Sequence, residues 1–152
     1  MKKIILLSFI SLSLLHAEIQ REYYPDGKVR LEASYRDGKR DGIYKEYYRN
    51  GNLKSEFSYR NGIKDGMQKK YARDNRLIYE INMYDGRRDG VCKEYYEDGS
   101  LRSEVTYRDG YKDGMAKYYS RDRQLLKEVR YRHDRVISGY KYYDGERIPF
   151  RP

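Results

Sequence analysis

The chain has 152 residues, of which 33 are Lys or Arg and 24 are Asp or Glu, so its formal net charge is +9 at pH 7. Leu, Ile, Val and Phe are scarce, whereas 20 residues are tyrosine, whose rings can bury area in place of aliphatic side chains. This length excludes two large enzyme domains, and this composition excludes a large aliphatic core and a membrane-embedded protein.

Residues 1–17 have the pattern of a secretory signal peptide. Lys2 and Lys3 precede an apolar stretch, 4–15, that is too short to span a bilayer, and the small residue Ala17 follows it. We therefore expect cleavage near Ala17 and export, to the periplasm or out of the cell. Cys92 is the single cysteine, so no intrachain disulfide can form, and we interpret it as a small packed residue rather than a reactive thiol.

After residue 18 the sequence repeats every 24 residues. Within 18–138 the units span 19–42, 43–66, 67–90, 91–114 and 115–138, and residues 139–152 form a C-terminal partial repeat or cap. The first position of each unit is apolar, the fifth is tyrosine and the fourteenth is glutamate. A fixed period of this length is typical of a stacked array, in which each unit buries its apolar side against its neighbours.

The glycines identify the structure of the unit. Of 13 glycines, 12 follow Asp or Asn, and these dipeptides supply the positive φ that tight hairpin turns need. Short runs rich in Tyr, Ile, Val and Leu lie between them, as in strands. We predict an all-β protein, an elongated antiparallel meander of five hairpins with about ten strands, seven-residue connections such as 60–66, and an exposed edge at each end.

Loop length decides which side chains share a face of the sheet. A three-residue loop, Asn50-Gly51-Asn52, with Gly51 in the left-handed conformation, collects most of the apolar side chains on one face, so we prefer that register. It predicts one face with Ile43, Tyr47, Leu53, Phe57 and Tyr59, and an opposite face with Glu46, Lys54, Glu56 and Arg60.

These units resemble the MORN-repeat variant found in many bacterial proteins. Segments such as 47–56 followed by 59–66 bring together the Tyr-Tyr, Asn-Gly, Leu, Glu, Tyr and Asp-Gly positions, and the likeness covers nearly everything after the signal peptide. The resemblance implies an elongated hairpin sheet that serves as an interaction scaffold. Many bacterial relatives are catalogued as antitoxins of toxin–antitoxin pairs, and an export signal would suit an immunity partner of an exported toxin.

Two columns of side chains are the candidate partner-binding residues. By the register above they share the apolar face. The third position is always basic and the fifth always tyrosine: Arg21, Lys45, Lys69, Lys93 and Lys117, then Tyr23, Tyr47, Tyr71, Tyr95 and Tyr119. In one interpretation the basic stems lie along the tyrosine rings and only help to solubilise the face. In the other, they line a groove for an acidic protein segment, an anionic lipid headgroup or a polyanionic glycan.

Catalysis has little support in the sequence, and we expect no catalytic residue, cofactor or metal site. His133 occupies a turn position, no His/Cys cluster has metal-ligand spacing, and the repeated glutamates sit in near-identical surroundings, unlike an acid–base pair. We do not expect nucleic-acid binding, because acids in every repeat dilute a basic track.

The hypothesis is therefore an exported, non-catalytic scaffold that binds a protein partner, one with an acidic surface if the basic column is used. A peripheral binder of anionic membrane lipid or cell-envelope polymer is the alternative. Edge-to-edge self-association stays open.

Overall fold

The computed structural model describes residues 18–150, and every regular element in that range is a β-strand. The predicted signal peptide, residues 1–17, lies outside the described residues. The strands are β1 (Glu18–Tyr23), β2 (Val29–Arg36), β3 (Lys39–Tyr47), β4 (Leu53–Arg60), β5 (Ile63–Tyr71), β6 (Leu77–Tyr84), β7 (Arg87–Arg88), β8 (Gly90–Tyr95), β9 (Leu101–Arg108), β10 (Tyr111–Tyr119), β11 (Leu125–Arg132), β12 (Arg135–Tyr143) and β13 (Glu146–Phe150).

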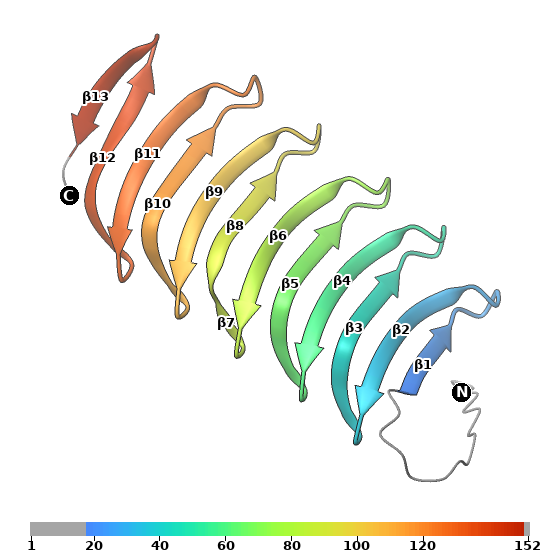
Figure 1. Ribbon diagram of the computed structural model, residues 1–152. Coiled ribbons are helices and arrows are strands. Elements are labelled where there is room, and N and C mark those ends of the chain that lie inside the picture. Colours follow the sequence, from blue (N-terminus) through green and yellow to red (C-terminus); the bar gives the residue numbers. More distant parts are fainter. Residues whose placement is uncertain (1–17, 151–152) are drawn as a thin grey trace.

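All described strands belong to one antiparallel sheet in chain order. The short β7 and the following β8 both pair with β6. The strands are curved and lie side by side, with β1 and β13 at opposite ends of an elongated sheet, which we call the ribbon (Figure 1). The predicted all-β meander is confirmed. Its described part has more than ten strands because residues 135–150 add the hairpin of β12 and β13.

Along one edge of the ribbon, two-residue turns join the strands. Asn61 and Gly62, with φ of 49° and 85°, connect β4 directly to β5, as expected of a turn whose two central residues both have positive φ. The predicted seven-residue connection over 60–66 is therefore wrong. The second Asp-Gly pair, Asp65-Gly66, lies inside β5 at a bulge where the register between β4 and β5 shifts.

Along the other edge, three-residue loops join the strands. In the second unit, Tyr48 N–H donates to the Asn52 carbonyl at 2.8 Å and Gly51 N–H donates to the Tyr48 carbonyl at 2.9 Å. Gly51 has φ 91°, so the predicted left-handed glycine is confirmed. The loop itself is residues 49–51, one residue earlier than predicted.

A bulge after this loop changes which side chains share a face. Tyr47 lies opposite Leu53 but Glu46 lies opposite Ser55, so Lys54 is an extra residue in β4. One extra residue sends all later side chains of β4 to the other face. As a result, Phe57 and Tyr59 lie opposite Tyr44 and Gly42, while Glu56 lies opposite Lys45. The predicted register placed Phe57 and Tyr59 with Ile43 and Tyr47, and Glu56 away from them, and it is wrong for these three.

The two faces of the sheet differ sharply in burial. We call the face formed by unit positions 2, 13, 15 and 17 the buried face, and the face formed by positions 1, 3, 5 and 14 the ladder face. The buried residues within described strands all lie on the buried face: Leu31, Ala33, Ser55, Gln68, Ile81, Cys92, Ser103, Val105, Ala116, Val129 and Gly139. The strands are bowed (Figure 1), and among the described residues no second layer covers the sheet, so this face is buried by neighbouring side chains of the same sheet.

The basic residues of position 22 lie over aromatic rings on the buried face. The guanidinium of Arg40 lies 4.9 Å from the ring centre of Tyr44 and 5.4 Å from that of Tyr59. Lys64 lies 4.3 Å from the Phe57 ring, and the same arrangement recurs between Lys112 and Tyr131 at 5.3 Å. Each such contact contributes about 0.5–1 kcal/mol at an exposed site, and its aromatic partner shields the small side chains beneath.

The last unit keeps its turns without glycine. Arg123 and Asp134 adopt φ of 62° and 63° at positions that are glycine in the first unit. At Ser138 the bulge is one residue shorter than in earlier units, so Gly139, not Tyr140, lies opposite Val129. A Cβ at Gly139 would lie 2.5 Å from the Phe150 ring, which explains a glycine that follows neither Asp nor Asn.

A pair of substitutions tests the role of the left-handed loop position. Arg123→Gly removes a strained conformation and is expected to raise the free energy of unfolding by about 1 kcal/mol. Gly51→Ala is expected to lower it by about 1–2 kcal/mol, and a Cβ there meets no atom within 4 Å, so the loss reports φ alone. Urea denaturation of both variants checks this, and equal effects of the same sign would contradict it.

Candidate interaction surface

The predicted partner-binding residues of positions 3 and 5 lie together on the ladder face. Lys93 Nζ lies 3.8 Å from Glu80 Oε1, and Tyr95 Oη donates a hydrogen bond of 3.1 Å to the same oxygen. Positions 3 and 5 lie two residues apart on the same strand of each unit, so their side chains point to the same face. Repeated from unit to unit, the basic residues and the tyrosines form two neighbouring rows across the ribbon.

The basic row is neutralised by the glutamates of position 14, which the sequence analysis placed on the opposite face. Arg21 Nε lies 2.8 Å from Glu32, and Lys45 Nζ lies 3.7 Å from Glu56. Lys93 lies between two carboxylates, Glu80 at 3.8 Å and Glu104 at 3.9 Å. The sequence analysis considered a groove lined by five cations. The structure instead has a row in which basic residues and glutamates alternate.

The ladder face also carries a row of exposed apolar side chains, which the sequence analysis placed on the apolar face but did not name among the candidate binding residues. These are the first-position residues, whose side chains remain 42–54% exposed: Ile19, Ile43, Met67, Val91 and Met115. The described part of the chain forms a single sheet, so no second layer covers them. The signal that could have revealed this row is the neighbouring second position, where small or polar residues are buried instead, such as Gln68, Cys92 and Ala116.

Tyrosines at position 6 of the first, second and fourth units bind the unit that follows, whereas the third and fifth units have Ala72 and Ser120 there. Tyr24 Oη donates to the Tyr47 carbonyl at 2.6 Å, Tyr48 to the Tyr71 carbonyl at 2.9 Å, and Tyr96 to the Tyr119 carbonyl at 2.8 Å. Sequence reasoning noted the Tyr-Tyr pairs but not this role. Each bond reaches from one unit into the next, so the rows of the ladder face are displayed on a braced frame.

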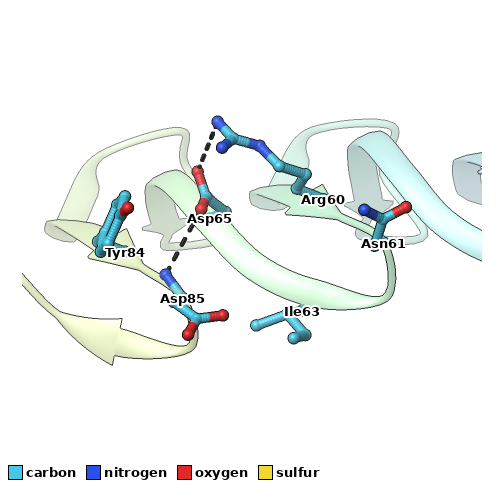
Figure 2. Close-up of a pocket in the computed structure, with 6 residues that line it drawn as sticks. All are labelled: Arg60, Asn61, Ile63, Asp65, Tyr84 and Asp85. Atoms are coloured by element: carbon cyan, nitrogen blue, oxygen red, sulfur yellow. Dashed lines mark hydrogen bonds and ion pairs between the residues drawn. The ribbon is translucent and has the colours of Figure 1, made fainter.

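The other edge is braced by contacts between turns and bulges, which leave a small hollow (Figure 2). Asp65 pairs with Arg60 at 3.1 Å and accepts a hydrogen bond of 3.4 Å from the Asp85 N–H. Gly86 N–H donates to the Lys64 carbonyl at 2.9 Å. The hollow holds about 190 Å³, below the roughly 300 Å³ where small-molecule pockets begin, and its central carboxylate is already bonded to the frame.

Groups capable of catalysis are scattered or occupied. His133 lies on the exposed turn between β11 and β12, with Nδ1 3.3 Å from Asp113. The described residues hold no group of three His, Cys, Asp or Glu side chains that could bind a metal ion. Cys92 is buried, and burial raises the pKa of its thiol, which disfavours the reactive thiolate.

The pKa of Tyr95 generates a prediction about alkaline stability. Burial first, and then Glu80, raises the pKa of Tyr95 to about 12, whereas an unfolded tyrosine titrates near 10. Between pH 10 and 12 the unfolded chain loses a proton that the folded chain keeps, so the free energy of unfolding falls as the pH rises. In Tyr95→Phe this fall should be shallower.

Chemical denaturation at several pH values between 9 and 12 measures that slope. Tyr143→Phe is the control, because the Tyr143 side chain is 72% exposed. An unchanged slope in Tyr95→Phe would contradict the partly buried environment of Tyr95 beside Glu80.

Residues 18–150 include no helix of the length and apolar character that a membrane span requires.

Comparison with known proteins agrees with the geometry. No curated protein matches the chain. A family model described as MORN repeat variant matches residues 19–37, 40–61 and 88–109, and its second and third matches begin two 24-residue units apart. The matched segments lie in hairpin units of the sheet, so these units are similar to the MORN repeat variant.

Proposed function

We propose that this protein is a non-catalytic scaffold that binds another protein through its ladder face. The observation that supports this most directly is the row of five first-position side chains, which cross the ribbon exposed on an uncovered sheet face. These apolar side chains alternate with polar register partners such as Ser58 and Thr106, and exposed apolar groups repeated across one sheet face favour an interaction site. The MORN repeat family is in general a non-catalytic repeat scaffold, which agrees with this proposal.

The chemistry of the ladder face favours a partner with an extended, mixed surface. Its apolar row runs beside a row of alternating Lys and Glu and a row of tyrosines, so a partner would bury apolar side chains and match charges of both signs. Tyrosines give large contact areas with little loss of rotamer freedom. An acidic partner surface, expected when the basic row was considered alone, gains no advantage from a row whose charges alternate.

In its more specific form, the proposal is an exported antitoxin or immunity-type protein. The pattern of residues 1–17 supports export, and the likeness to bacterial MORN-variant proteins catalogued as antitoxins supports the immunity role. One stoichiometric protein partner is the expected consequence.

Binding of an anionic lipid or envelope polymer is the second candidate, and the C-terminal end favours it. Residues 115–152 hold ten Lys or Arg and five Asp or Glu, a net charge of +5. Lys127 and Lys141 lie directly opposite each other, and both ammonium groups lie over the Phe150 ring, at 5.1 and 5.7 Å. Like charges in register repel each other, and a bound anion would relieve that repulsion.

Substitution of the apolar row tests the first candidate. The triple variant Ile43→Thr, Met67→Thr, Val91→Thr keeps β-propensity on exposed sites, so it should fold normally but recover its crosslinked partner at least about tenfold less well. The matched triple variant Lys45→Gln, Lys69→Gln, Lys93→Gln should weaken capture less, because each lysine already has a glutamate neighbour. Undiminished capture by the threonine variant would contradict the proposal.

Sedimentation with anionic vesicles tests the second candidate. Salt-sensitive binding that Lys127→Gln, Lys141→Gln abolishes, and that the threonine triple variant keeps, would favour the lipid or polymer function over the protein-binding one.

A further inference from the structure

The two ends of the sheet are unequal. Among the described residues β1 pairs only with β2, and β13 only with β12, so each presents an unpaired strand edge. Pro149 lies in β13 and has no N–H to donate, and proline in an edge strand faces its missing donor to solvent. β1 contains no proline and is exposed at every residue. Strand addition is therefore possible at β1 and obstructed at β13.

The internal units show what the open edge of β1 lacks. In every unit after the first, the position-3 base has a glutamate as register partner on both sides, as Lys93 has Glu80 and Glu104. Within residues 18–150, Arg21 has only Glu32 as register partner, and no strand lies along its outer flank. The next position shows the same deficit, because Gln20 is exposed whereas the equivalent Gln68, between two strands, is 2% exposed.

We propose that β1 accepts an antiparallel strand from another protein, in which a carboxylate faces Arg21 and the residue after it is apolar and faces Gln20. This pattern is copied from the internal interfaces, where Glu80 faces Lys93 and Glu104 faces Lys117, and where Val105, after Glu104, faces Ala116. Main-chain hydrogen bonds to the open edge supply affinity and the carboxylate fixes the register. The inference does not depend on the ladder face being a docking surface.

A second copy of the chain does not fit this edge. The ladder-face residues of β1 are Ile19, Arg21 and Tyr23, so pairing β1 with β1 offers no carboxylate to Arg21. β13 presents Arg147 and Pro149 on that face, so a head-to-tail stack also lacks the acid and meets the proline. The missing strand must therefore come from a different chain.

A peptide with the sequence of residues 101–108, LRSEVTYR, is the probe for this site. Its Glu104 and Val105 already oppose Lys117 and Ala116 inside the sheet, so it carries the required pair. The fluorescently labelled peptide is expected to bind the purified protein, and a peptide with Glu104→Lys should bind about fivefold more weakly. Binding should slow hydrogen exchange of the β1 amides and leave β13 unchanged.

A charge exchange assigns the contact to Arg21. The Arg21→Glu protein should reverse the preference and bind the Glu104→Lys peptide within about twofold of the original pair. The carboxylate introduced by Arg21→Glu faces Glu32, and their repulsion could loosen β1. The Arg21→Gln protein avoids this repulsion, and it should bind both peptides about equally.

Several outcomes would overturn the inference. One is a peptide preference that ignores Arg21, another is protection from exchange at any strand other than β1, and a third is absence of peptide binding. Dimerisation through β1 in sedimentation velocity would assign the edge to a second copy instead. The Ile43→Thr, Met67→Thr, Val91→Thr protein should bind the peptide like the wild type, so failure here is distinguishable from failure of the ladder-face proposal.

Discussion

A single layer of strands has no opposing layer against which to bury its apolar side chains, and this constraint shapes the whole protein. Most domains pack two layers around a core. In the described part of this chain, burial comes only from neighbouring strands of the same sheet, so the side chains fully enclosed on the buried face are mostly small, such as Ala33, Ala116 and Val129. Aromatic rings and position-22 cations then form their cover.

The same constraint leaves the other face open. First-position apolar residues stay 42–54% exposed even in the interior of the array, because no second layer of the described chain covers this face. Hydrogen bonds at both edges, from the position-6 tyrosines and between turns and bulges, keep this face at a constant spacing. A rigid array of identical rows is a suitable surface for binding an extended partner, because little conformational freedom is lost on association.

Much of the fold could be predicted from the sequence because the repeat period and the Asp-Gly and Asn-Gly pairs are local signals. The face assignment could not, because the bulge at Lys54 has no residue signature of its own and one inserted residue reverses the remainder of β4. The two Asp-Gly or Asn-Gly pairs at the end of each of the first four units are also chemically alike. Asn61-Gly62 makes a turn whereas Asp65-Gly66 makes a bulge, and the difference is set by the next unit, whose turn bonds to Asp65 and Lys64. The candidate residues were correctly placed on one face, but their neutralising glutamates were not.

Two adjacent residues offer the most direct test of the account, because the structure places them on opposite faces. Cys92 is 9% exposed on the buried face, and Val91 is 45% exposed on the ladder face. In the folded protein, a thiol reagent should label Val91→Cys in a Cys92→Ala background at least about tenfold faster than it labels Cys92 in the wild type. Equal rates, or faster labelling of Cys92, would contradict a sheet that buries one face with its own side chains and leaves the other uncovered.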